Sequence, residues 1–227
     1  AKPELTPILQ DLIVAAALPL RGLERDFAAD SSGFTTCRFN RWVDEKHGIP
    51  RAKKEHEWIK AHIMVGTHTN VVTPVEISDW LGGDTTHFPA LVQQTAKSFD
   101  VADVSADKAY LTKANVELIE QLGATSYIPF KSNTKPVLGI GSAWARMYHR
   151  FMSEPEMYMA RYHRRSNVET TFSMIKGKFG DAVLSKSPVG QANEVLCKVL
   201  AHNIVVVGQA AIEFGIDPST PAGRSND

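Results

Sequence analysis

Two apolar, β-branched runs separated by a short polar loop constrain the fold of this chain most. Residues 58–65 and 71–77 are each long enough for one strand, and residues 66–70 between them have the composition of a five-residue hairpin loop. A shorter run, residues 25–30, alternates apolar and polar side chains before Ser31-Ser-Gly, and so predicts a first strand that ends in a turn. The chain therefore opens with three strands that can pair antiparallel.

Helices and strands alternate after this hairpin. Thr112 is placed to cap a helix and Gly123 to end it, and similar patterns mark the other elements. We expect helices over 5–18, 86–97, 112–122, 162–179 and 191–214, with further strands over 101–107 and 126–130.

This order predicts an α/β fold. Three early antiparallel strands followed by strands that alternate with helices give a mixed sheet flanked by helices, which is also the element order of a ribonuclease-H-like fold. We expect an N-terminal helix and lead-in over residues 1–24, one ribonuclease-H-like domain over 25–216, and a disordered tail over 217–227.

Composition excludes some classes of protein and leaves others open. The chain has 227 residues, 43% of them apolar, and equal numbers of acidic and basic side chains, so a nucleic-acid partner would need a local basic surface. Cys37 and Cys197 have no metal-site spacing and imply no disulfide framework. The apolar stretch 12–20 is too short to cross a bilayer, no nucleotide-binding glycine loop is present, and we expect neither a membrane nor a nucleotide partner.

The helix expected over 162–179 carries the strongest functional signal. On a helical wheel its polar motif residues share a stripe about 60° wide, beside a second, apolar stripe. A polar group in this position lies at the rim of a packed element. The ordinary alternative is a surface helix with an i,i+4 ion pair between Arg165 and Glu169. The polar stripe consists of Tyr162, Arg165, Glu169 and Lys176, and the apolar stripe of Val168, Phe172, Ile175 and Phe179.

The spacing Tyr-x2-Arg-x3-Glu-x6-Lys resembles the motif around the last acidic residue of DDE transposases from bacterial insertion sequences, the cut-and-paste group. Two further segments agree with this family: Asp30-Ser-Ser-Gly-Phe34 is similar to its first-Asp motif and Ala106-Asp-Lys-Ala-Tyr110 to its second. Ala109 stands where the family usually has glycine. The resemblance implies a catalytic, metal-binding triad of Asp30, Asp107 and Glu169.

Carboxylates in these places fit the chemistry of phosphodiester cleavage. Two Mg²⁺ ions about 3.5–4 Å apart can activate water and neutralise the leaving oxygen, and Mg²⁺ or Mn²⁺ prefers oxygen ligands. Asp30 and Asp107 end two expected strands, and such strand ends can converge. Taken singly, each is equally well a turn residue or a strand-end cap. Asp84 with His87 is a minor candidate for the same site.

Basic residues gather around the proposed catalytic helix. Residues 131–178 hold nine basic and three acidic side chains, a net charge of +6, although an exposed basic face without a ligand is common. The resemblance implies that Arg165 and Lys176 contact DNA phosphates and that Tyr162 packs or stacks there. Arg164, Lys108 and Lys178 are further candidates for DNA contacts.

The expected function is that of a transposase catalytic domain, which hydrolyses DNA at transposon ends and transfers the strand into target DNA. It would work as a homodimer assembled on DNA, in the cytoplasm of a bacterium and close to the nucleoid. Two alternatives remain open: a ribonuclease-H-like nuclease that does not join DNA, and a catalytically silent DNA-binding remnant.

Overall fold

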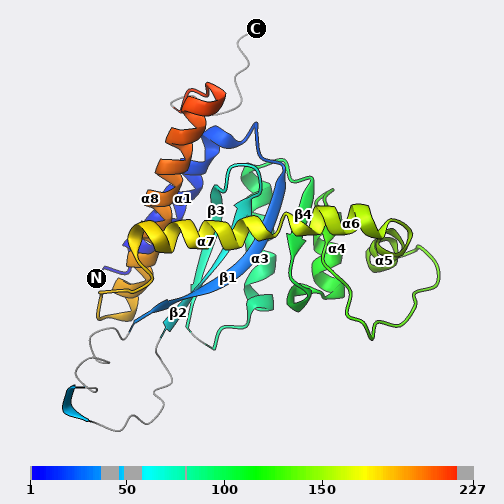
Figure 1. The fold of residues 1–227 in the computed structure, drawn as a ribbon, viewed down its shortest axis with the longest axis horizontal. Coiled ribbons are helices and arrows are strands. Elements are labelled where there is room, and N and C mark those ends of the chain that lie inside the picture. Colours follow the sequence, from blue (N-terminus) through cyan, green and yellow to red (C-terminus); the bar gives the residue numbers. More distant parts are fainter. Residues whose placement is uncertain (1, 37–45, 49–57, 80, 219–227) are drawn as a thin grey trace.

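The computed structural model describes residues 2–36, 46–48, 58–79 and 81–218. A five-stranded mixed sheet with helices on both faces forms its centre, as the α/β expectation requires (Figure 1). Cys37 and most of the expected tail, residues 219–227, lie outside the described residues. The strands are β1 (Asp26–Thr35), β2 (Trp58–Gly66), β3 (Val72–Ser78), β4 (Asp103–Ala106) and β5 (Thr125–Tyr127).

The strands are arranged in the order β3-β2-β1-β4-β5. The β1–β2 and β2–β3 pairs are antiparallel, whereas β4 lies parallel to both β1 and β5. The antiparallel half is the hairpin expected from the two β-branched runs, and the parallel half follows because helices connect its strands. Strand β1 is thus central, with neighbours on both sides.

The first strand is longer than the sequence pattern predicts. We expected a turn at Ser31-Ser-Gly33, but β1 continues to Thr35 and pairs with β2 from Phe27 to Thr35. Pairing along this whole length overrides the local turn preference. Gly33 retains a role because a Cβ there would lie 3.1 Å from the Trp58 ring. Asp30 therefore lies inside a strand and not at its end.

Helices cover the two faces of the sheet and bury separate apolar clusters. Phe27 and Ala29 project toward α3 and α4, whereas Ala28 and Phe34 project toward α7, because side chains alternate along a strand. The helical segments are α1 (Leu5–Ala17), η1 (Leu18–Leu20), α3 (Asp84–Ser98), η2 (Lys108–Tyr110), α4 (Lys113–Gln121), α5 (Ala143–Ser153), α6 (Pro155–His163), α7 (Ser166–Phe179) and α8 (Pro188–Phe214).

The helix expected over 162–179 is divided between α6 and α7. A turn at Arg164–Arg165 separates them, and its backbone bonds span three residues, as from Arg165 N–H to the Tyr162 carbonyl and from Val168 N–H to the Arg165 carbonyl. Both arginines keep right-handed helical dihedrals, so the chain changes pitch without reversing. The motif's Tyr162 consequently lies in the last turn of one helix, and Glu169 lies in the first turn of the next.

Helix α8 has 27 residues and is largely apolar, although charged residues such as Lys198 interrupt it. By length and composition it could cross a membrane, with a mean hydropathy of 1.7 in its most apolar window. Its contacts are those of a core helix, because it packs against α1, α7, β2 and β3. Val195 and Leu196 join the cluster under α7, and Val206 and Val207 join the cluster under α3, so α8 connects both.

Candidate active site

Asp30 lies on the face of the sheet that α7 covers. Its neighbour Ser31 donates its backbone N–H to the Asp30 Oδ1 at 2.8 Å, and Arg165 Nη1 donates to Oδ2 at 2.7 Å. Burial raises the pKa of the Asp30 carboxyl above its ordinary value; Ser31 and Arg165 oppose this rise, and nearby Glu169 and Asp107 add to it. The three acidic residues are thus close enough to influence one another.

Asp107 follows the last residue of β4. The parallel ladder pairs Ala29 with Ala106, so Asp30 and Asp107 occupy the next row of adjacent strands. Alternation turns Asp107 toward the same face as Asp103, which contacts α6. Its carboxylate accepts the Lys108 backbone N–H at 2.5 Å and caps η2. Asp107 therefore does act as a cap at the end of its strand, which was the alternative to a catalytic role.

Glu169 is linked to Asp30 through one guanidinium group. Arg165 Nη2 donates to the Glu169 Oε1 at 2.6 Å while Nη1 holds Asp30, so Arg165 bridges carboxylates from α7 and β1. The i,i+4 ion pair between Arg165 and Glu169 is present, but it is half of a larger arrangement. The Arg165 side chain is only 17% exposed, which places this bridge at the edge of the packed core.

Within the described residues, no three histidine, cysteine, aspartate or glutamate side chains are close enough to hold a metal ion as they stand. The expected metal-sized cluster of Asp30, Asp107 and Glu169 is therefore not assembled in this structure. Arg165 occupies the space between two of the carboxylates, and the third faces its own backbone. The donor set still fits Mg²⁺, because it offers carboxylate oxygens, and two of the three carboxylates already hold a positive charge between them.

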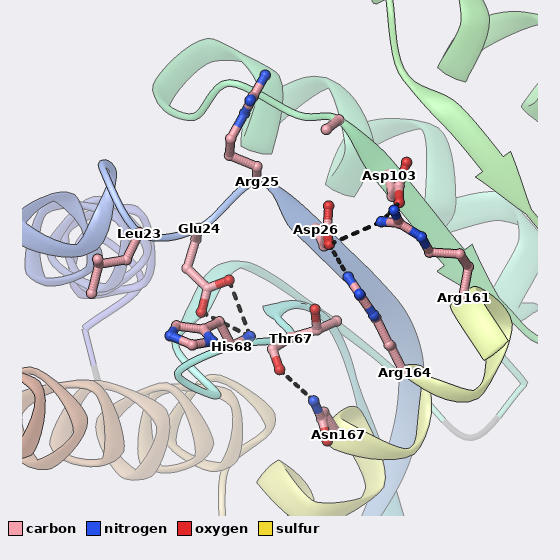
Figure 2. A pocket seen from close by; sticks show the side chains of 11 residues that line it. Leu23, Glu24, Arg25, Asp26, Thr67, His68, Asp103, Arg161, Arg164 and Asn167 are labelled. Atoms are coloured by element: carbon pink, nitrogen blue, oxygen red, sulfur yellow. Dashed lines mark hydrogen bonds and ion pairs between the residues drawn. The ribbon is translucent and has the colours of Figure 1, made fainter.

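A pocket of about 710 Å³ opens beside this site, along the amino-terminal ends of β1 and β4. Figure 2 shows Arg161 and Arg164 reaching from the α6–α7 junction toward Asp26 and Asp103. Arg161 contacts the Asp103 carboxylate at 2.8 Å, and Arg164 is ion-paired with Asp26. The pocket does not contain the acidic triad, and its three arginines, Arg25, Arg161 and Arg164, are each paired with a carboxylate.

The other predicted DNA contacts differ in how exposed they are and in which groups they already contact. Lys176 donates to the Ser32 hydroxyl at 2.6 Å and lies over the Phe34 ring, and burial lowers its pKa. Tyr162 is half-buried against the cluster around α5 and α6. Lys108 and Lys178 are exposed at the ends of η2 and α7. Lys108 and Lys178 are therefore the two exposed lysines of the predicted group.

Comparison with known proteins identifies the family. A family model described as a transposase DDE domain matches residues 21–204. The chain belongs to this family. It is also similar to the "Probable transposase for insertion sequence element ISA1214" of Archaeoglobus fulgidus, with 22% identity over 186 residues, or 82% of this chain and 55% of the relative. The chain thus spans about half the length of this relative. The resemblance to transposases of insertion sequences is confirmed.

Sequence reasoning missed Glu24 and did not foresee the contact that Asp84 makes. Glu24 is fully buried and accepts hydrogen bonds from the backbone of His68 and Thr69, so it organises the β2–β3 loop. Nothing in the local sequence distinguishes it from a surface acid. Asp84, which we weighed only as a minor candidate, contacts Ser31 on the face opposite Asp30. The Gly-Gly-Asp start of its helix was the available signal.

Proposed function

We propose that this chain is the catalytic domain of a DNA transposase that hydrolyses phosphodiester bonds at transposon ends and then joins the freed strand to target DNA. The observation that carries the proposal is the bridge formed by Arg165 between Asp30 and Glu169, with Asp107 in the adjacent strand position. Carboxylates from β1 and α7 thus contact one partly buried cation, and a third carboxylate follows the adjacent strand.

The proposed fold type is ribonuclease-H-like. The strand order β3-β2-β1-β4-β5, with antiparallel pairing on one side of β1 and parallel pairing on the other, supports it. In this arrangement a central strand supplies the first aspartate, its parallel neighbour the second, and a covering helix the glutamate. Residues 25–216 remain the proposed extent of this domain.

The residues proposed to hold Mg²⁺ or Mn²⁺, as two ions, are Asp30, Asp107 and Glu169. When bound, the ions would supply an activated water and charge neutralisation at the leaving oxygen. Before that, Arg165 neutralises Asp30 and Glu169 and keeps both carboxylates turned toward the same space. A guanidinium released from them can donate two parallel bonds to a DNA phosphate, which suits Arg165 to both tasks.

DNA is the proposed partner, both as transposon end and as target, and a homodimer assembled on DNA is the proposed working form. Contacts are assigned to Tyr162, Arg164, Arg165, Lys176, Lys108 and Lys178. The net charge of +6 over residues 131–178 supports this surface. The proposed location is the bacterial cytoplasm, in association with the nucleoid.

The proposal is tested with Glu169→Gln, which keeps the size of the side chain but removes an anionic metal ligand. We expect metal-dependent cleavage of supercoiled plasmid DNA to fall by at least about 100-fold, in line with the rate effects of losing one catalytic group, while DNA binding persists. Glu156→Gln is the matched control, because Glu156 lies in the first turn of α6 as Glu169 does in α7. Cleavage by Glu169→Gln at the parent rate would overturn the proposed site.

Metal binding and joining are measured separately. Mg²⁺ or Mn²⁺ at millimolar concentration should raise the melting temperature of the parent by mass action and raise that of Glu169→Gln less. A melting temperature that neither ion changes would contradict the metal site. A joining assay on DNA that carries the insertion sequence then distinguishes a transposase, which joins strands, from a nuclease that only cuts.

A further inference from the structure

The backbone ladder between β1 and β4 stops just before the two aspartates. Its last paired row is Ala29 with Ala106, one residue short of Asp30 and Asp107. The relative position of these two side chains is therefore not fixed by direct strand pairing. Metal ligands must be held within about 0.5 Å of their productive geometry, so another connection between the two segments is required.

Ser31 connects Asp30 to the opposite face of the sheet. Its backbone N–H donates to the Asp30 Oδ1 at 2.8 Å, on the side that α7 covers. Its side chain points the other way, because neighbours alternate along a strand, and its hydroxyl donates to the Asp84 Oδ1 at 2.8 Å. One serine thus joins Asp30 to the first turn of α3.

Asp84 is itself anchored by residues of β2. Lys60 Nζ donates to the Asp84 Oδ1 at 2.9 Å and to the Gly82 carbonyl at 3.3 Å. The buried His62 brings Nδ1 to within 3.6 Å of the same carboxylate, and this nitrogen has no hydrogen-bond partner in the described part of the chain. Burial alone would raise the pKa of Asp84, but the hydrogen bonds from Lys60 and Ser31 hold it below its ordinary value.

The same helical turn also holds the segment that carries Asp107. The Thr85 hydroxyl donates to the Ala109 carbonyl at 3.2 Å, two residues beyond Asp107. The Tyr110 ring, three residues beyond Asp107, packs 5.2 Å from the Phe88 ring of α3. The start of α3 therefore contacts both segments whose direct pairing has ended.

We propose that Asp84 is a positioning residue that fixes Asp30 relative to Asp107 through the hydroxyl of Ser31 and the first turn of α3. It lies behind β1 and does not reach the metal ligands' side of the sheet. The inference rests on the proposed function, since it concerns ligands of the proposed metal site. Partners that hold metal ligands in this way typically alter metal affinity by about 10–100-fold.

Mn²⁺ alone is the probe, titrated calorimetrically into the whole folded chain without DNA. We expect Asp84→Ala to weaken Mn²⁺ affinity by about 10-fold and Ser31→Ala to weaken it similarly. The double variant should bind Mn²⁺ no more weakly than the weaker-binding single variant, because both substitutions break the same Asp84–Ser31 connection. Asp84→Asn, whose amide oxygen still accepts from Ser31, should restore most of the affinity. Asp79→Ala is the matched control, since Asp79 is an exposed acid whose carboxylate accepts the backbone N–H of Leu81 in its own loop.

Each outcome bears on the inference. Parent-like Mn²⁺ affinity in folded Asp84→Ala, losses that multiply in the double variant, or Asp84→Asn as weak as Asp84→Ala would each overturn it. Should Asp84→Ala not fold, Ser31→Ala decides alone, because it leaves the Lys60–Asp84 pair in place, and parent-like affinity in that variant overturns the inference. A parent that binds no Mn²⁺ overturns the proposed function together with this inference, whereas a parent that binds with an unaffected Asp84→Ala overturns the inference only.

Discussion

Single charged groups decide most of the chemistry of the proposed site. Arg165 donates to carboxylates from two elements, Asp30 and Glu169, at 2.7 and 2.6 Å. An exposed ion pair contributes at most about 1 kcal/mol, whereas removing one partner of a buried pair costs about 3–5 kcal/mol. With 17% of its side chain exposed, Arg165 lies between these limits. It therefore stabilises two acids whose mutual repulsion would otherwise oppose folding.

His62 makes stability depend on pH on the other side of the sheet. Burial lowers its pKa to about 4 from 6.5, with a contribution from the stacked His87 and from Lys60, against the opposing charge of Asp84. The unfolded chain takes up a proton below pH 6.5, but the folded chain does not until about pH 4. Stability is therefore lost as pH falls between these two values, by up to about 3 kcal/mol.

We expect His62→Gln to flatten that dependence, because glutamine does not titrate. Urea unfolding is measured at several pH values between 7 and 4. As the pH falls, the free energy of unfolding of the parent should decrease by up to about 3 kcal/mol more than that of the variant. His163→Gln, which changes an exposed histidine, should leave the parent slope unchanged. Parallel curves for the parent and His62→Gln would show that His62 titrates normally in the folded protein.

Helix α7 shows how one element both packs and carries the proposed site. Val168, Phe172 and Ile175 are buried against β1 and β2, as the wheel predicts, and Glu169 lies outside this stripe. The packed side holds the helix, and the adjoining side presents the carboxylate. A negative charge in the first turn of a helix is also favoured by the helix dipole.

Phe172→Ala should therefore reduce the free energy of unfolding by about 3–5 kcal/mol, because it removes a buried aromatic ring and leaves a cavity. Phe172 is 6% exposed and also lies under the Lys176 ammonium group. Thr170→Ala on the exposed side of α7 is the control and should change stability by no more than about 0.5 kcal/mol. Chemical denaturation measures both, and equal effects would mean that α7 does not pack as described.

The sequence predicted the periodic elements well and their boundaries less well. The hairpin strands and the Thr112 cap of α4 follow from local chemistry, and they form as expected. The turn expected at Ser31 does not form, because its preference is weaker than nine rows of pairing with β2. The Asp84–Ser31 contact joins residues 53 positions apart, so only the folded sheet reveals it.

The charge distribution of the whole molecule is less one-sided than the sequence suggests. Residues 131–178 carry a net charge of +6, but several of their arginines pair with acids from elsewhere in the chain. Arg146 pairs with Glu120, Arg161 with Asp103 and Arg164 with Asp26. A phosphate must compete with a carboxylate at each of these positions, whereas an exposed lysine only releases water and counterions.

We therefore expect Lys178→Ala to lower the salt dependence of DNA binding by about one unit of slope, and Arg146→Ala to lower it by clearly less. Fluorescence anisotropy with a labelled duplex between about 50 and 200 mM salt gives both slopes. Lys186→Ala, an exposed lysine outside residues 131–178, serves as the control. Equal slopes for Arg146→Ala and Lys178→Ala would mean that the ion pairs do not limit access to phosphate.

The position of α8 in the chain has a consequence for how the protein is made. Ribosomes add about 5–20 residues per second, so β5 is finished several seconds before the last turn of α8 at Phe214 is synthesised. During that time the nascent chain exposes apolar side chains on both faces of its sheet, including the partners of Val195 and Val206. Messages broken before the segment that encodes α8 would yield chains that never cover these surfaces, and such products become substrates for chaperones and proteases.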